Sequence, residues 1–253
     1  QPISKLNVSG PDIDSSIVIT DSNSSDSTRA SFNLNSSDAV FSIGSVDGTD
    51  LQSVSKLLQL EFGYGYGNIA LGQGSMANNI TTGSNNIAIG VDTLTANISG
   101  YENIAMGYGA LSANTLGVHN VAIGGWQGFS GTLSSNTYGN YNVALGSSAS
   151  YSNTIGNDNV AIGVDSLTTN VWSSQNVAVG KGALQLGTAT GTVAVGYHAG
   201  DEITTGAYNV ILGYDVDAPS DTGSYQLNIG NIIFGTNVNG IGKAISSGNI
   251  GIG

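Results

Sequence analysis

Apolar and polar residues follow one short pattern along most of the chain: Asn, an aliphatic residue, Ala, a second aliphatic residue and Gly. Successive copies begin 18, 17, 17, 22, 17, 17, 16 and 17 residues apart. They begin at Asn68, Asn86, Asn103, Asn120, Asn142, Asn159 and Asn176, and in weaker form at Thr192 and Asn209. A short, nearly constant period indicates a solenoid in which each repeat forms one coil.

Alternation within each copy predicts a short strand. Ile87 and Ile89 lie on one face of that strand and Ala88 lies on the other. Gly90 permits a positive φ, so the chain can reverse there. A second short strand is expected next, followed by a second turn at a glycine three residues before the next copy. The expected second strands include residues 108–112, 164–168 and 181–185. About nine such coils, at a strand spacing of about 4.8 Å, predict a parallel β-solenoid.

The repeated Asn is expected to have a structural role. Asn side chains stacked from coil to coil can bond the backbone at a turn and the amides above and below them. The positions are Asn68, Asn86, Asn103, Asn120, Asn142, Asn159, Asn176 and Asn209. The coil that begins at Thr192 lacks this Asn, so an altered turn is expected there.

The aliphatic positions leave a row of Ile and Val on the outside of a coil that is too thin to bury them. Each such side chain left in water forfeits roughly 1.5–3 kcal/mol. Packing this face against identical copies around a common axis would remove it from water. The pattern therefore predicts an obligate homo-oligomer, without fixing the number of chains.

The two ends of the chain differ from the repeats in their sequence pattern. Residues 1–62 are predicted to form a β-rich cap or connector, with three short strands between residues 16 and 45. Residues 50–62 fit a short helix about as well as a strand. The repeat domain is expected over residues 63–216, and residues 217–253 are expected to form a C-terminal segment of strands intertwined between chains. Such modules would cover the open ends of a solenoid.

Composition excludes several classes of partner. The chain has 253 residues, 5 basic against 17 acidic, a net charge of -12 and no Cys. Phosphate backbones and anionic membrane surfaces are bound mainly through Lys and Arg, so a nucleic-acid partner is not expected. No run of 18 apolar residues is present, so membrane insertion is not expected either.

Candidate catalytic or metal-binding residues are few. Neither His119 nor His198 has a serine or carboxylate partner at a recognisable spacing, and each is interpreted as a surface residue. The acidic pairs Asp201–Glu202 and Asp215/Asp217 could hold Ca²⁺ through oxygen ligands, but solvated turn residues are the favoured interpretation. We therefore predict no catalytic residue, no metal site and no cofactor.

Aromatic residues give the better functional clue. The repeat that begins at Asn120 is five residues too long, and the extra length falls within residues 125–141. Its rings, at Trp126, Phe129, Tyr138 and Tyr141, are the predicted ligand-binding residues. Insertions into a solenoid often form its binding face, and rings beside amides suit sugars. The alternative is that the rings pack the enlarged coil.

A second feature is a row of residues, each one position before a repeated Asn. Its members include Glu102, His119, Tyr141, Asp158 and Gln175. Because their polarity varies, the row is expected to be an exposed ladder rather than part of the core.

The repeats resemble the left-handed parallel β-roll in the head of trimeric autotransporter adhesins, and still more closely the repeats of bacteriophage tail-fibre proteins. Residues 227–253 are similar to the segment just before the self-cleaving intramolecular chaperone domain of such fibres. The resemblance covers roughly residues 63–253. It implies an all-β, left-handed roll of about nine coils, a homotrimer, and a chaperone domain that was cleaved off or left out.

The resemblance leads us to expect a non-enzymatic, extracellular part of a virion: a structural and receptor-binding segment of a tail fibre. Its expected partners are itself, a host cell-surface glycan or protein, and other virion tail proteins. One alternative is the head of a trimeric adhesin on a bacterial cell surface. Another is a tailspike glycosidase with its acids between subunits, which would need two carboxylates several Å apart in a groove.

Overall fold

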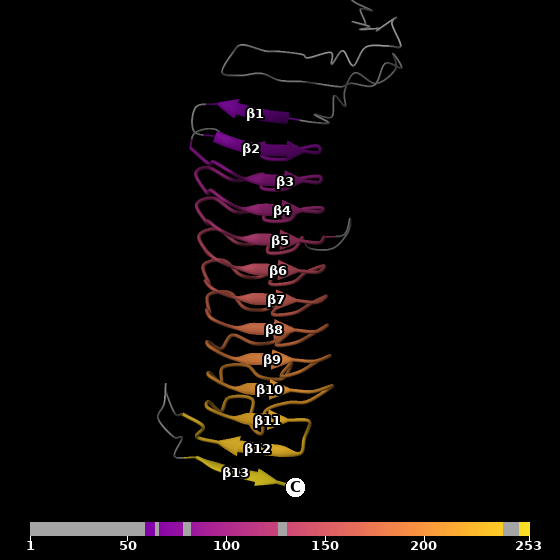
Figure 1. Cartoon of the computed structure of the whole chain (residues 1–253), viewed down its shortest axis with the longest axis vertical. Coiled ribbons are helices and arrows are strands. Elements are labelled where there is room, and N and C mark those ends of the chain that lie inside the picture. The colour runs from indigo at the N-terminus through magenta and orange to yellow at the C-terminus, as the bar shows by residue number, and fades with distance from the viewer. Residues whose placement is uncertain (1–58, 64–65, 78–81, 126–130, 240–247) are drawn as a thin grey trace, which may run out of the picture. The chain divides into compact units, whose positions relative to one another are not determined.

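A computed structural model describes residues 59–63, 66–77, 82–125, 131–239 and 248–253. Within these ranges the protein is all-β, with no helix, and its strands form one sheet in sequence order from β1 to β13 (Figure 1). The strands predicted between residues 16 and 45 lie outside the described residues, as does most of the segment 50–62. The end of that segment is a strand, β1.

The strands are short and regularly spaced. They are β1 (Gln59–Gly63), β2 (Tyr66–Leu71), β3 (Ile87–Ile89), β4 (Ile104–Met106), β5 (Val121–Ile123), β6 (Val143–Leu145), β7 (Val160–Ile162), β8 (Val177–Val179), β9 (Val193–Val195), β10 (Val210–Leu212), β11 (Leu227–Ile229), β12 (Ile233–Thr236) and β13 (Asn249–Ile252). From β2 to β11 each strand pairs in parallel with the next, as in β3 and β4. The predicted parallel solenoid of about nine turns is confirmed.

The register places like residues on like residues. Ala88 pairs with Ala105, and Ala105 with Ala122, and all three side chains are fully buried. The aliphatic residues on either side of each Ala point to the other face of the strand and remain partly exposed. The predicted division of the two faces is therefore confirmed, and the small Ala side chain is what allows the rest of the coil to approach the strand closely.

The prediction of a second strand in each coil is wrong. In the segment 108–112 the chain makes two consecutive turns, closed by hydrogen bonds from Ala110 N to Gly107 O (3.4 Å) and from Ser112 N to Gly109 O (3.3 Å). Gly109 (φ 64°) and Leu111 (φ 51°) are left-handed, which a strand does not allow. The segments 164–168 and 181–185 are turns of the same kind.

A column of leucines explains why these turns are stable. Left-handed backbone costs a residue with a side chain roughly 1–2 kcal/mol. Full burial of a Leu side chain contributes about 1.5–3 kcal/mol, which offsets that cost. The leucines of the column are Leu94, Leu111, Leu133, Leu167 and Leu184, all with φ near 50° and all buried.

The parallel ladder continues past the predicted domain boundary at residue 216. Residues 226–230 repeat the pattern, with Gln226 in place of the Asn, and β11 pairs with β10 in register. The chain then reverses, so that β12 and β13 pair antiparallel. At the other end β1 is antiparallel to β2. Intertwining of residues 217–253 between chains stays a prediction.

Candidate functional site

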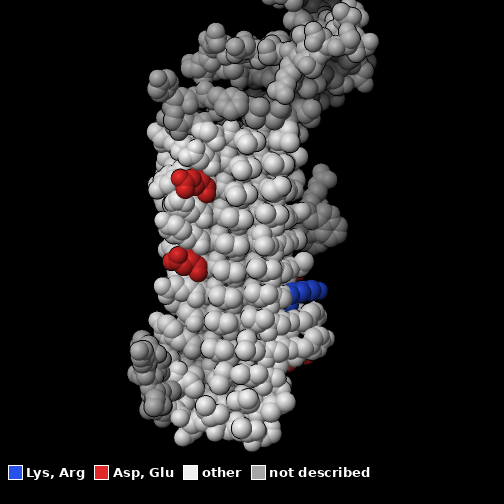
Figure 2. All heavy atoms as spheres, viewed as in Figure 1, with Lys and Arg blue, Asp and Glu red and all other residues white. Residues whose placement is uncertain are grey.

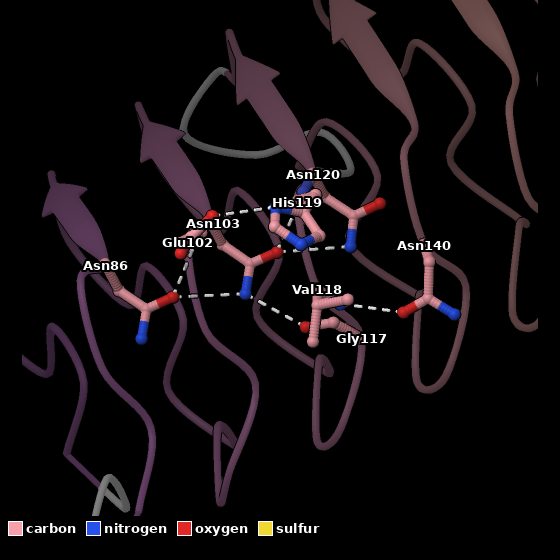
Figure 3. A network of polar contacts seen from close by, with 8 residues as sticks. All are labelled: Asn86, Glu102, Asn103, Gly117, Val118, His119, Asn120 and Asn140. Carbon is pink, nitrogen blue, oxygen red and sulfur yellow. Dashed lines mark hydrogen bonds and ion pairs between the residues drawn. The ribbon is translucent and has the colours of Figure 1, made fainter.

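The repeated Asn side chains form a buried ladder along the coils (Figure 3). The backbone N–H and the amide Nδ2 of Asn103 both donate to Asn86 Oδ1, at 3.0 and 3.1 Å. Asn103 Nδ2 also donates to Gly117 O at 2.9 Å. Asn120 makes the same contacts one coil later. Because most of these Asn side chains join their own strand to a neighbouring coil and to a turn, the bonds support the structural role predicted for them.

A second buried ladder runs beside the first and was missed by sequence reasoning. Asn114 Nδ2 donates to Asn97 Oδ1 at 3.0 Å and to Gly117 O at 3.0 Å. Gly117 O therefore accepts from both ladders. The members of the second ladder are Asn97, Asn114, Asn136, Asn153 and Asn170, all fully buried. The signal was present in the sequence, because four of the five lie three residues before a turn glycine.

The turn glycine lies tightly against its neighbours in four of these coils, and Ser173 takes its place in the fifth. A Cβ added to Gly139 would lie 2.3 Å from Asn136 Oδ1 and 2.4 Å from Gly156 O. A side chain at this position would thus displace both an amide of the second ladder and the backbone of the next coil.

The coil that lacks the repeated Asn is joined to the following coil by longer bonds. Thr192 N donates to Asn176 Oδ1 at 3.0 Å, but the Thr192 Oγ1 contact with Gly206 O is 3.5 Å. Asn209 N donates to Thr192 Oγ1 at 3.4 Å. The hydrogen bonds of the ladder continue through this coil but are weaker there.

The structure describes two of the four predicted glycan-binding residues. Trp126 and Phe129 lie outside the described residues. Tyr138 and Tyr141 stand on either side of Gly139 in one turn, with 55% and 57% of their surface exposed. Each Tyr, however, belongs to a different row along the coils.

Tyr141 belongs to the expected ladder of residues that precede the repeated Asn. His119 stacks on Tyr141 with ring centroids 4.8 Å apart and planes 12° apart, and Tyr101 meets His119 edge-on at 5.3 Å. His119 Nδ1 lies 3.0 Å from Glu102 Oε2 (Figure 3). Each member of the row has a left-handed φ, and His119 is half-buried whereas Glu102 and Tyr141 are exposed. The expected exposed ladder is confirmed.

Tyr138 belongs to an apolar row that sequence reasoning missed. Leu116, Tyr138, Ile155 and Trp172 each follow an Asn of the second ladder by two residues. Their exposed fractions are 45%, 55%, 48% and 66%. The signal was the equal offset of Trp172 and Tyr138 from that Asn, which only becomes visible once the second ladder is known.

Both histidines have a carboxylate partner, contrary to the interpretation from sequence spacing. Glu102 is one coil away from His119, a separation that no local motif reveals. His198 Nδ1 contacts Asp201 Oδ2 three residues further on. All four side chains are partly exposed, so the residues remain at the surface as expected.

Acidic residues gather near the C-terminal coils. Glu202 N donates to Asp217 Oδ1 at 3.2 Å. Burial raises the pKa of the Asp217 carboxyl, the Glu202 N–H lowers it, and the charges of Asp201, Glu202 and Asp221 raise it, with a net increase. In the part of the chain that the structure describes, no group of three or more His, Asp or Glu is arranged to hold a metal ion.

The outer face of the strands is an apolar surface that extends along the coils. Its residues are those before and after the buried Ala of each strand. The most exposed of them are Ile69 (39%), Met106 (36%), Ile123 (40%), Ile162 (37%) and Val195 (38%). The face of the molecule shown in Figure 2 carries charged side chains only near its margins.

Comparisons of the chain with models of known protein families, with curated proteins and with solved structures found no match. Among the described residues, no helix has the length and apolarity needed to cross a membrane.

Proposed function

We propose that the protein is a structural and receptor-binding segment of a bacteriophage tail fibre, built as a homotrimer of left-handed β-rolls. The observation that carries the proposal is the aliphatic strand face, which runs across the parallel coils, while the buried central residue of the strands β3 to β9 is Ala. A strand that turns its two larger aliphatic residues outward and its Ala inward is suited to packing against copies of the chain.

The energetics favour association. Ile and Val side chains left about one-third exposed lose part of the roughly 1.5–3 kcal/mol that full burial of each would contribute. Over the nine or so coils this loss is large compared with the 5–15 kcal/mol by which domains are usually stable. Closed cyclic symmetry buries the face on every chain at once.

Multivalent attachment is the proposed mechanism, and the segment is proposed to be non-enzymatic and extracellular on the virion. Three identical weak sites on one rigid assembly gain avidity when the host surface displays many copies of the ligand. The remaining partners proposed are other tail proteins at the two ends of the fibre. Regular backbone ladders make the coils a rigid support for such sites.

Adsorption to bacteria tests this function. We expect the purified full chain, fluorescently labelled, to bind saturably to some strains in a panel of bacteria and to be competed off by unlabelled protein. Failure to bind any strain would argue against a receptor-binding role. Release of reducing ends from the surface polysaccharide of a bound strain would contradict the non-enzymatic part of the proposal.

A further inference from the structure

Three coils present a turn whose exposed surface combines rings, amides and a carboxylate. Within each turn, three successive outward positions recur in register. The residues at the first position, two of which carry aromatic rings, are called the ring row. Those at the second position, two of which carry amides, are called the amide row. Those at the third position are called the outer row. The ring row is Tyr138, Ile155 and Trp172; the amide row is Asn140, Asn157 and Ser174; the outer row is Tyr141, Asp158 and Gln175.

The ring row is exposed and held by a rigid backbone. Thr137 N, directly before Tyr138, donates to Thr154 O at 2.9 Å, and Thr154 N, directly before Ile155, donates to Val171 O at 2.8 Å; Val171 itself precedes Trp172. Tyr138 and Trp172 are two coils apart, about 10 Å at the usual strand spacing. Large rings that are more than half exposed on a regular backbone indicate an interaction surface.

The amide row supplies hydrogen-bonding groups beside the rings. Asn140 N and Nδ2 both donate to Asn157 Oδ1, at 2.8 and 3.2 Å, and Asn157 N donates to Ser174 Oγ at 2.9 Å. Asn157 Nδ2 donates to Ile155 O at 3.2 Å, so the amide is pinned next to the ring row. An amide nitrogen has two hydrogens, which leaves each of these half-buried amides able to donate outward.

The outer row sets the charge of the surface. Asp158 is exposed and is the one charged side chain among the three rows. His119 stacks on Tyr141 of the outer row and is paired with Glu102, whereas Lys181 lies in the following coil after its strand and belongs to no row. The three rows contain no Lys or Arg, so the carboxylate of Asp158 makes their surface unfavourable for anionic ligands.

We infer that the three rows form a binding site for an uncharged glycan. Sugar rings present apolar C–H faces, which pack on Tyr and Trp, and hydroxyls, which bond amides and carboxylates. The mixture of polar rows with rings distinguishes this surface from the purely aliphatic strand face, which suits a second copy of the chain. The inference rests on the proposed receptor-binding function and names the ligand class and Trp172 as its principal contact.

A glycan array printed with neutral and acidic bacterial glycans tests the site, using the full chain. The wild type is expected to bind neutral glycans. Trp172→Ala and Tyr138→Ala are each expected to weaken that binding about tenfold or more, as loss of a central aromatic contact does. Trp172→Phe should retain most of it. Tyr214→Ala is the matched control, because Tyr214 is 75% exposed but lies outside the three rows.

Several results would overturn the inference. They are binding to acidic glycans only, binding to no glycan, unchanged neutral binding by both Ala variants, or a changed assembly mass for Trp172→Ala, which would make the ring row a subunit contact. A wild type that adsorbs to bacteria yet binds nothing on the array would remove the inference and leave the proposed function standing. A wild type that does neither would remove both.

Discussion

At the residue scale, the coil depends on a few positions whose local backbone is unfavourable and whose burial compensates for it. The left-handed leucines are the main case. Ser150 interrupts their column: it has φ 53°, is 1% exposed and lies between the coils of Leu133 and Leu167. Its Oγ is buried without a hydrogen-bond partner. The column therefore has one weak position.

Ser150→Ala is expected to stabilise the protein by about 1 kcal/mol, because it removes a buried hydroxyl that has no partner. Ser150→Leu should add the burial of a larger side chain and complete the column. Both are measured as the free energy of unfolding in urea. A loss of stability in both variants would show that this position does not behave as part of the leucine column.

Asp217 gives a prediction about pH. Its pKa is raised above 3.8 in the folded state, chiefly by burial, so the folded protein binds more protons than the unfolded chain between 3.8 and the raised value. Stability attributable to this group therefore falls as pH rises through that window and is recovered on acidification. Asp217→Asn should remove the dependence and raise the melting temperature at pH 7 slightly, on the order of a degree. A lower melting temperature at pH 7 would contradict this account.

At the element scale, strands as short as three residues are stable because side-chain ladders join them. Much of this could be predicted from sequence: the strand position, the inward Ala88 and outward Ile87, and the role of Asn103 follow from a five-residue pattern. The turns could not, because a buried Leu111 after a glycine fits a strand as well as a left-handed turn. Trp172 was missed because its relation to Tyr138 depends on the second ladder.

The Asn ladder can be tested by two substitutions at one position. Asn120→Ala removes the amide that accepts from Asn142 N and Nδ2 and donates to Asn103 Oδ1 and Gly139 O. Since each buried group left unpaired costs about 1–3 kcal/mol, we expect a loss of roughly 2–4 kcal/mol. Asn120→Thr should lose less, because the chain itself uses Thr192 at this position. Equal losses would mean that the ladder hydrogen bonds contribute little.

At the scale of the whole molecule, the aliphatic strand face is the surface through which we propose that the chains assemble. Ile123→Asp places a charge in the middle of this face, at a side chain that is 40% exposed in the single chain. We expect the oligomer to dissociate, since a buried charge without a partner is strongly unfavourable. Leu116→Asp introduces the same charge at a turn residue of similar exposure and should leave the mass unchanged. If Leu116→Asp dissociated the oligomer and Ile123→Asp did not, the subunit contact would have to lie at the turn instead of the strand face.

The mass of the wild-type protein in dilute solution is the most direct test of the account. Sedimentation equilibrium of the folded chain is expected to give three times the 25.5 kDa of one chain, independent of concentration down to the lowest that can be measured. A stable, folded species of 25.5 kDa, with its strand face in water, would contradict it.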